Sequence, residues 1–550
     1  MSHEFLLTVL LVLPFAGSVA AMLFPVNARN AEAWLAGAVT LGALIITLSF
    51  YADVANNDVV RATFEWLSAY RLDFVLRVDG YAWLLAVLVT GIGLLITLYA
   101  RYYMSPQDPV PRFFSFLLAF MGSMLGVVLS GNLIQLVFFW ELTSFFSFLL
   151  IGYWHHNAAA REGARMALVV TSTGGLCLFA GVLILGRIVG SYDLDDVLAS
   201  GDLIRTHDLY LPALVLILLG ALTKSAQFPF HFWLPNAMTA PTPVSAYLHS
   251  AAMVKLGVFL MARLWPVLSG TDAWFWSVGG AGLATLLLGA YAAMFQNDLK
   301  ALLAYSTLSH LGLITLLLGL NSPLAAVAAV FHTMNHATFK ASLFMSVGIV
   351  DHETGTRDMR RLHGLYRTMP VTGTLAIVAS AAMAGVPLLN GFLSKEMFFS
   401  ETVFVDAHPA IQWLLPGAAT LAGENTHSVH RGQCRPRRYP ARSAGTLPQR
   451  QGRPTSGSGG LLKFALREVD DQGPPLAAPV GARGIQELPV ERDRANDFDD
   501  AAGDVGAVRD VPPQDVVSRA GNRNPELLRR LPTSMPATGP HDHAIPTRLN

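Results

Sequence analysis

Several ionisable side chains fall within one short, otherwise apolar stretch of the chain, from Leu222 to Gly257. They are Lys224, His231, His249 and Lys255. An ionisable group at membrane depth costs about 2.5–3.5 kcal/mol even on lenient scales, so such groups are seldom idle. The pattern indicates an ion pathway. The alternative is a tight loop with lysines at a membrane surface, which is less favoured because Lys224 and Lys255 have apolar turns on both sides.

Prolines interrupt the same stretch. They are Pro229, Pro235, Pro241 and Pro243. A helix broken by proline survives in lipid only where protein or a water-filled cavity covers the freed backbone groups. Lysines and histidines beside a broken helix are typical of a transporter site near the membrane midplane. We therefore expect a broken helix near Pro235, with Pro229 in the same interruption.

A single carboxylate lies in the middle of the apolar sequence NLIQLVFFWELTSFFSFLLIGYW. This residue, Glu141, is unfavourable at such depth unless it is paired or takes up a proton. Lys224 is the natural partner, because it is the next lysine along the chain and is similarly deep. Such a pair can change its protonation when a neighbour moves. The alternative is a purely structural ion pair.

Three further polar residues, His332, His336 and Lys340, recur every four residues in FHTMNHATFKASLFMSVG. This spacing places them along one face of a helix. Because histidine titrates near neutral pH, the pattern predicts a proton relay. Two histidines one turn apart could instead share a metal ion, but no third ligand or HExxH glutamate follows, so we expect no metal. His310, in AYSTLSHLGLI, is either a relay member or a packing residue.

A second proline-interrupted segment is AMAGVPLLNGFLSKEMFFSE. Pro387, Asn390 and Gly391 break the apolar run, and Lys395 follows. The segment repeats the arrangement around Lys224, so it predicts internal repeats with two half-sites. The adjacent Glu396 could instead neutralise Lys395 locally.

The elements that position these residues are membrane helices. Of 550 residues, 53% are hydrophobic and 14% are charged, whereas soluble chains carry about 25% charged residues. The net charge is zero, which argues against a nucleic-acid partner. The two cysteines, Cys177 and Cys434, cannot form a disulfide framework.

A membrane span needs about 20 apolar residues, and the chain offers about twelve such spans and the start of a thirteenth. The candidates are residues 5–25, 33–51, 80–100, 113–130, 132–153, 165–188, 209–234, 244–264, 275–295, 301–320, 323–350, 371–400 and 410–423. Arginine and lysine gather in alternate loops, which favours an external N-terminus. We therefore predict an all-α polytopic membrane protein of 12–13 spans, with broken helices near Pro235 and Pro387. We expect an external cap over 51–79 and a solvated loop or short amphipathic helix over 191–208.

The composition changes abruptly after Gly423. Residues 424–550 hold no apolar run long enough to span a membrane and are rich in Arg, Pro, Gly, Ala and Asp. Such a segment cannot bury enough apolar surface to offset chain entropy, so disorder is the physical default. Because the change falls inside an apolar run, one hypothesis is a change of reading frame near Gly423. The alternative is a genuine soluble tail.

Long motifs in the chain resemble the antiporter-like subunits shared by Mrp-type cation/proton antiporters and respiratory complex I. They are LGALTKSAQFPFHFWLPNAMTAPTPVSAYLHSAAMVKLGVFLMARL, DLKALLAYSTLSHLG, HATFKASLF and MAGVPLLNGFLSKEMFF. The resemblance covers about residues 1–423. The runs VDHETGTRDMRRLHGL and NGFLSKEMFF look like those of the large A subunit of Mrp-type (Mnh or Pha) antiporters.

This resemblance implies two inverted five-helix repeats, each with a broken helix. The implied organisation is N-terminal helices and an external loop (1–112), a first repeat (113–264), an incomplete second repeat (265–423) and the polar tail (424–550). By motif match, Glu141 and Lys224 look like the family's ion pair, and His249 with Lys255 like the link to the second half. His332, His336 and Lys340 match the histidine–lysine helix, and Lys395 matches the terminal lysine.

The resemblance implies a subunit of a multisubunit Na⁺ or K⁺/proton antiporter in the bacterial plasma membrane, working with other antiporter subunits. It would be a transporter and not an enzyme, and the chain carries no flavin, iron–sulfur or haem motif, so we expect no cofactor. The main alternative is a proton-pumping subunit of a complex I-like NADH–quinone oxidoreductase. A further alternative is a non-conducting scaffold subunit or the inactive product of a broken gene.

Overall fold

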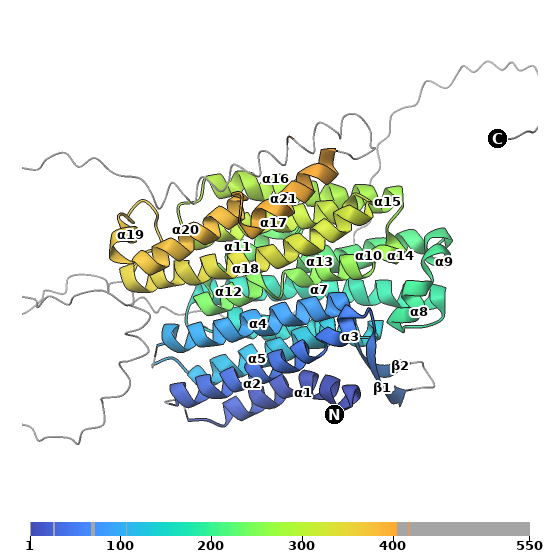
Figure 1. Cartoon of the computed structure of the whole chain (residues 1–550), viewed down its shortest axis with the longest axis horizontal. Coiled ribbons are helices and arrows are strands. Elements are labelled where there is room, and N and C mark those ends of the chain that lie inside the picture. The colour runs from blue at the N-terminus through green and yellow to red at the C-terminus, as the bar shows by residue number, and fades with distance from the viewer. Residues whose placement is uncertain (1, 26–27, 68–71, 106, 404–416, 418–550) are drawn as a thin grey trace, which may run out of the picture. The chain divides into compact units, whose positions relative to one another are not determined.

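The computed structural model describes residues 2–25, 28–67, 72–105, 107–403 and 417. Its N-terminal part is made of three long helices and a β-hairpin. The elements are α1 (His3–Met22), α2 (Arg29–Ser49), α3 (Tyr51–Ala55), β1 (Val60–Leu67), β2 (Leu72–Val78) and α4 (Gly80–Tyr103). Helix α1 packs on α2, and α2 packs on α4 (Figure 1).

The next part contains the helices that surround the first candidate half-site. They are α5 (Val110–Val128), α6 (Leu133–Ile151), α7 (Ala158–Val189), α8 (Leu194–Ala199), α9 (Gly201–Thr206) and α10 (Tyr210–Lys224). Consecutive long helices pack side by side, α5 on α6, α6 on α7 and α7 on α10. For the segment 191–208 we expected a solvated loop or a short amphipathic helix, and the structure has the two short helices α8 and α9 there.

The predicted interruption follows α10. Short helical turns replace one continuous helix: η2 (Phe230–Phe232), α11 (Trp233–Asn236), η3 (Ala237–Thr239), α12 (Thr242–Ser250) and α13 (Lys255–Arg263). The single predicted span 209–234 is therefore α10 plus a broken segment. A second interruption, between α12 and α13, falls where the sequence has no proline and was not predicted.

The remaining described helices form the second half. They are α14 (Trp265–Leu268), α15 (Asp272–Trp274), η4 (Phe275–Gly279), α16 (Gly280–Met294), α17 (Leu299–Gly319), α18 (Pro323–Thr354), α19 (Leu365–Thr368), α20 (Pro370–Ala384) and α21 (Asn390–Val403). Helix α18 contacts α17, α12, α20 and α21, so it lies between both halves of the molecule (Figure 1). The predicted break near Pro387 separates α20 from α21.

Several of the long helices begin where a polar side chain precedes an apolar run. Asn132 caps α6, Asp298 caps α17 and Ser322 caps α18, each accepting a hydrogen bond from a backbone N–H of the first turn. Such caps satisfy donors that a helix start leaves unpaired. They fix the ends of the helices, and with them the depth of every charged residue inside.

Nine helical segments among the described residues are long and apolar enough to cross a membrane, and α10 and α20 are shorter apolar helices. The helical class and the multi-span architecture predicted from sequence are confirmed. The candidate span 410–423 and the segment 424–550 lie outside the described residues except for Gly417.

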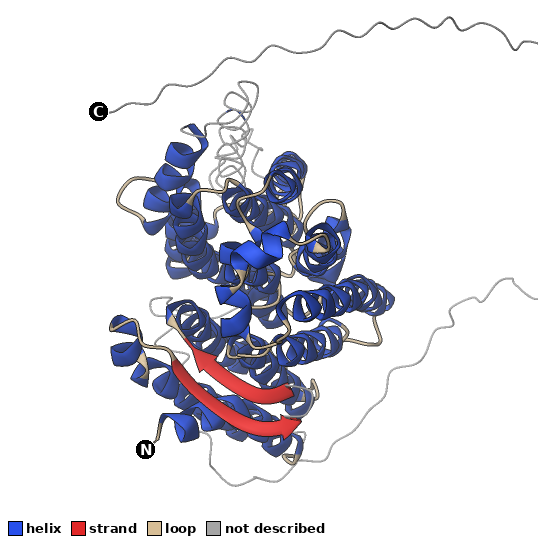
Figure 2. Cartoon of the chain, turned by 90° about the vertical axis from the view of Figure 1, so that its right-hand side faces the viewer, coloured by secondary structure: helices blue, strands red, loops and turns tan. Residues whose placement is uncertain are grey.

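The segment 51–79, expected as a polar cap, holds the antiparallel hairpin β1–β2, which the sequence analysis missed. The hairpin lies across the ends of several helices (Figure 2). Its second strand bonds to the α5–α6 connection, with Gly131 N donating to Val75 O at 2.8 Å. This long-range partner, more than fifty residues along the chain, is not revealed by the alternation of residues within the strands.

Charged side chains, two of them buried arginines, join the hairpin end of the molecule to the helices. The Asp79 carboxylate accepts hydrogen bonds from Arg77 and from Arg263, the last residue of α13. Burial alone would raise the pKa of the Asp79 carboxyl group. The two guanidinium groups and the Ala82 N–H outweigh this effect and hold the pKa well below its usual range.

Candidate ion pathway

The first half-site is built around Lys224, the last residue of α10. Its side chain is fully buried. Its Nζ donates to Trp140 O at 3.0 Å and to Ser144 Oγ at 2.7 Å, both on α6, and lies 5.2 Å from the centre of the Trp140 ring. The helix C-terminus also favours a cation there. These contacts bind the end of α10 to the helix that carries Glu141.

Glu141 lies on α6 next to this lysine contact, but the two side chains do not share a direct hydrogen bond in the described structure. The ammonium group bonds instead to the backbone carbonyl of the preceding residue, Trp140. The Lys224 charge still acts on Glu141, whose buried Oε1 has no hydrogen-bond partner among the described residues. The arrangement is an electrostatic pair without direct contact. Its role as a switch stays a prediction.

A glycine makes room for this carboxylate. A Cβ added at Gly175 of α7 would overlap Glu141 Oε1. Helix α7 therefore approaches α6 closely at this point, which keeps the carboxylate enclosed by protein.

The two interruptions of the first half are tied together by Ser225, which sequence reasoning missed. Its hydroxyl donates to Val254 O at 2.7 Å and accepts from Val258 N at 3.1 Å. A break at 225 is thus joined to the break at 251–254, and Lys255 begins the next helix. The available signal was a serine beside a lysine. The partners of Ser225 lie about thirty residues along the chain, and how the helices pack determines whether they meet it.

Lys255 joins the two halves of the molecule. Its side chain is fully buried, and its Nζ donates to Ser250 O and lies 2.9 Å from His336 Nδ1 of α18. The predicted link between the halves is therefore a direct contact in the structure. The transport role of that contact stays a prediction.

A row of histidines continues from this point. The His336 ring centre is 5.5 Å from that of His310 on α17, and His310 Nδ1 is 3.0 Å from His332 Nε2. His332 Nδ1 is in turn 3.0 Å from Ser394 Oγ on α21. Each imidazole can donate from one nitrogen and accept at the other, so the row can pass a proton along. His310 is thus placed within the row.

One link in the row is open. His336 Nε2 has no hydrogen-bond partner among the described residues, although the rings of His336 and His310 are close. A rotation of either ring or an inserted water would close this gap. We refer to the contacts from Lys255 through His336, His310 and His332 to Ser394 as the histidine row.

Lys340 and Lys395 lie beside the histidine row. Lys340 is fully buried, and its Nζ donates to Ser306 Oγ of α17 at 2.5 Å. Lys395 is half-buried and donates to Ala384 O, the last residue of α20, at 3.1 Å. Glu396, considered as a local counter-charge, is exposed.

His249 is close to the pathway but makes no polar contact. It is fully buried on α12, and neither ring nitrogen has a hydrogen-bond partner among the described residues. Its ring lies between those of Trp233 and Phe344, at 6.3 and 6.4 Å. Trp233 Nε1 in turn donates to Thr223 O, next to Lys224, so Trp233 connects the His249 ring to the end of α10.

The predicted break residues occupy different places in the two interruptions. Pro229 precedes η2 and Pro235 lies within α11, whereas Pro387 lies between α20 and α21. Gly391 lies in the first turn of α21, where an added Cβ would overlap Ala382 O of α20. Glycine therefore allows the two halves of that broken helix to pack closely.

Lys300 is a buried lysine whose importance sequence reasoning missed. It is 2% exposed, and its Nζ donates to Ala240 O at 3.1 Å. In the sequence it appears only as one basic residue in a short loop. Its position in α17 and its bond to the broken segment at Ala240 show that it is instead held inside the protein.

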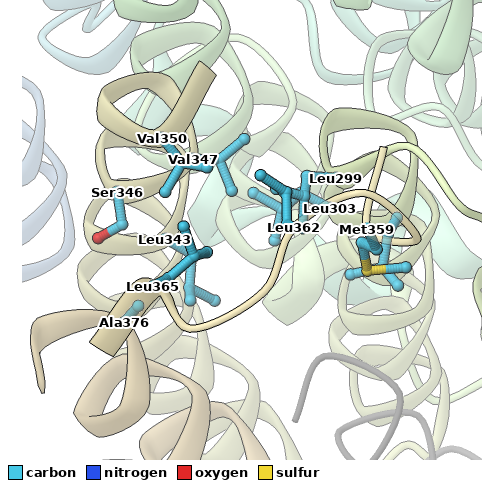
Figure 3. A pocket seen from close by; sticks show the side chains of 11 residues that line it. Leu299, Leu303, Leu343, Ser346, Val347, Val350, Met359, Leu362, Leu365 and Ala376 are labelled. Carbon is cyan, nitrogen blue, oxygen red and sulfur yellow. The ribbon is translucent and has the colours of Figure 1, made fainter. Parts of the chain in front are cut away.

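Two cavities differ in character. A small one of about 30 Å³ between α17, α18 and α20 is lined by apolar side chains such as Leu303, Leu343 and Val347, with Ser346 at its edge (Figure 3). It offers no charge to an ion. A larger one of about 310 Å³ is lined by Glu162, Asp298 and Arg357 among others.

Family models match two parts of the chain. Residues 130–418 match the model described as "NADH:quinone oxidoreductase/Mrp antiporter, TM". Residues 66–114 match "NADH-Ubiquinone oxidoreductase (complex I), chain 5 N-terminus".

Curated relatives carry antiporter names. The chain is 67% identical over 420 residues to the A/B subunit of a probable K⁺/H⁺ antiporter from Rhizobium meliloti, covering 76% of this chain and 42% of the relative. It is 49% identical over 382 residues to the A subunit of a Na⁺/H⁺ antiporter from Alkalihalophilus pseudofirmus, covering 67% and 48%. The chain thus spans less than half the length of these two relatives.

Solved structures share the fold. A chain of the Mrp complex from a Dietzia species superposes with a TM-score of 0.72 at 36% identity, covering 77% of this chain and 46% of that one. A chain of an archaeal membrane-bound sulfane sulfur reductase superposes with a TM-score of 0.71 at 21% identity, covering 78% and 88%, which shows the fold alone. From the match over residues 130–418, the chain belongs to the NADH:quinone oxidoreductase/Mrp antiporter transmembrane family.

Proposed function

We propose that this chain is one subunit of a multisubunit monovalent cation/proton antiporter and carries protons through its buried Glu, Lys and His residues. The observation that supports this most is the histidine row, which leads from Lys255 on α13 past three imidazoles to Ser394 on α21, with a ring contact and no hydrogen bond between His336 and His310. A row of titratable groups enclosed by apolar helices is typical of a proton relay.

The names of the relatives favour an antiporter over the complex I-like alternative. Both Na⁺ and K⁺ occur in those names, so the cation is a matter for experiment. In this proposal the partners are other antiporter subunits, the location is the bacterial plasma membrane, and the N-terminus is external. The alternation of basic loops supports this orientation.

The test is cation-dependent proton exchange in everted membrane vesicles from an antiporter-deficient host. The host would express the chain with its neighbouring genes, both as written and with the reading frame changed after Gly423. Exchange on addition of Na⁺ or K⁺ with either form would support the proposal. Proton pumping driven by NADH and insensitive to both cations would support the complex I-like alternative instead.

A further inference from the structure

Two asparagine side chains join α18 to α21 beside the histidine row. Asn335 Nδ2 donates to Asn390 O at 3.0 Å, and Asn390 Nδ2 donates to Asn335 Oδ1 at 3.2 Å. Asn335 is 1% exposed, whereas Asn390 is exposed and is the first residue of α21. The sequence indicates Asn390 only as a residue that interrupts an apolar run, and the structure gives it a partner on another helix. We call this contact the amide pair.

The amide pair lies about one helical turn from the end of the histidine row. Asn335 follows His332 by three residues on α18, and Asn390 precedes Ser394 by four residues on α21. Residues three or four apart lie on the same face of a helix. Because His332 Nδ1 is 3.0 Å from Ser394 Oγ, the two helices run antiparallel here and meet at two successive polar contacts.

A third polar contact lies farther along the same two helices, which pack against each other (Figure 1). Ser322, the cap of α18, donates from its Oγ to Glu401 Oε2 at 2.7 Å. The contact between His332 and Ser394 therefore has a polar contact on either side, the amide pair towards one end and Ser322 with Glu401 towards the other.

Helix α21 depends on such contacts because it is not continuous with α20. Residues 385–389 separate the two helices, and Gly385 and Leu388 in this segment have φ angles of 80° and 74°. A continuous helix would fix the rotation and height of every residue of α21, and the break removes that constraint. A shift of one residue turns a helix by about 100° and moves it by about 1.5 Å. Ser394 would then no longer face His332.

The position of Ser394 also decides which nitrogen of His332 carries the proton. Ser394 Oγ donates to Gly391 O at 3.2 Å. A hydroxyl group has one hydrogen, so with this bond made it accepts a hydrogen bond from His332 Nδ1. His332 then accepts at Nε2, which is 3.0 Å from His310 Nδ1. A turn of α21 would remove both the partner and this preference.

We infer that Asn335 and Asn390 are positioning residues that hold Ser394 in register with His332. The inference rests on the proposed function. Neither amide takes up or releases a proton, so both act through the contact between His332 and Ser394. The amide suits this task because it donates and accepts at once, which lets one side chain bind both the backbone and the side chain of its partner.

The alternative is that the amide pair contributes only to stability. In that case its loss lowers the amount of assembled complex, and any effect on exchange is the same whether or not Ser394 is present. A positioning role predicts the opposite dependence. Once the Ser394 hydroxyl has been removed, the register of α21 has nothing left to align, so loss of the amide pair has no further effect.

Exchange is measured in everted vesicles and divided by the amount of complex. Asn335→Leu, similar in volume but without the amide, should lower exchange by about tenfold, as expected for Ser394→Ala. Asn390→Ala leaves its backbone carbonyl for Asn335 and should lower exchange by about threefold. Thr333→Val is the matched control, because this buried hydroxyl donates to Ala329 O of its own helix.

The decisive comparison places the same changes in the Ser394→Ala background. We expect Asn335→Leu and Asn390→Ala to leave the residual exchange of Ser394→Ala unchanged. A further loss there, as large as in the otherwise unaltered chain, would overturn the inference. If Asn335→Leu does not assemble, Asn390→Ala on the exposed side of the contact gives the same comparison.

Register is measured separately, without any need for transport. In a background lacking Cys177 and Cys434, Ser322→Cys and Glu401→Cys place two thiols where the side chains now meet. A short bifunctional thiol reagent should join them in the assembled complex. Adding Asn390→Ala should lower the yield, and adding Thr333→Val should not. Equal yields with and without Asn390→Ala would overturn the inference.

The two measurements separate this inference from the proposed function. The cross-linking yield reports the position of α21 whether or not the complex transports. Absence of exchange by the unaltered complex would count against the proposed function, whereas an unchanged yield in an active complex would count against the positioning role alone.

Discussion

The two interrupted helices hold their lysines in different ways. Lys224 is fully buried at the end of α10 and bonds to another helix, through Trp140 O and Ser144 Oγ. Lys395 is half-buried and bonds to Ala384, the end of its own broken helix. In the second half it is the neighbouring Ser394 that reaches the histidine row.

This difference suggests a division of roles. At the first break a charge is positioned between two helices, so a shift of α10 relative to α6 changes its surroundings directly. At the second break the Ser394 hydroxyl continues the histidine row. The charge of Lys395 lies beside the row and is not part of it. The first half-site would then set the protonation state, and the second would pass the proton onward.

The sharpest test of the comparison is removal of charge at the first half-site. Lys224→Met and Glu141→Gln should each lower exchange by roughly 10²-fold or more, the usual range for loss of a positioned proton-transfer group. Exchange is measured in everted vesicles, with the amount of complex checked by immunoblot. Unchanged exchange by Glu141→Gln, or by Glu141→Ala, in a normally assembled complex would refute the role given to Glu141.

At the second half-site the hydroxyl should matter as much as the lysine. Ser394→Ala removes the partner of His332 and should lower exchange by about tenfold, whereas Ser394→Thr, which keeps a hydroxyl, should retain more activity. The control is Thr402→Ala, which removes another buried hydroxyl farther along α21. If Ser394→Ala and Thr402→Ala behaved alike, the row would not include Ser394.

Stability should respond to Asp79, which fixes the end of the Lys255 helix through Arg263. Loss of one partner of a buried ion pair costs about 3 kcal/mol, so Asp79→Asn should lower the melting temperature at pH 7. The folded-state pKa of Asp79 is depressed, so its stabilisation is present above the unfolded pKa of about 3.9 and is lost as the pH falls further. The difference in melting temperature between the unaltered protein and Asp79→Asn should therefore become smaller as the pH is lowered.

If the difference in melting temperature between the unaltered protein and Asp79→Asn stayed constant from neutral to strongly acidic pH, this account of Asp79 would be contradicted. Asp202→Asn is a suitable control, because that carboxylate is fully exposed and pairs with Arg205 of its own helix. Exposed pairs of this kind contribute about 0–1 kcal/mol.

We expect the smallest effects from substitution of two glycines, one at each half-site. Gly175→Ala would press on Glu141, and Gly391→Ala would press on Ala382 across the second break. Overpacking of this kind costs about 1–3 kcal/mol. Gly175→Ala should also slow exchange. Gly37→Ala, where an added Cβ meets nothing within 4 Å, should change neither the stability nor the exchange rate. Equal effects of Gly175→Ala and Gly37→Ala would show that α7 does not confine the carboxylate.

Much of the site was predictable because membrane burial makes charged residues conspicuous. Glu141, Lys224, and the residues His332, His336 and Lys340 on one helix face could be found from depth and spacing alone. Their partners could not. Lys255 and His336 are about eighty residues apart, and their contact depends on how α13 packs against α18.

The features that sequence reasoning missed share a physical cause. The break at 251–254 has no proline to mark it, and Ser225 of another segment bonds to Val254 O and Val258 N beside it. Lys300 looks like a loop residue until the broken segment covers it. The strands β1 and β2 pair with each other, and the hairpin is also joined to the helices through the α5–α6 connection.

The central claim is that protons move along the histidine row, and the contact between Lys255 and His336 tests it most directly. Exchange would be measured in everted vesicles for Lys255→Met, His336→Leu and the double variant, each with its assembly verified. We predict that either single change abolishes exchange and that the double variant is no worse than either, because both break the same link. Full exchange by either single variant would contradict the account.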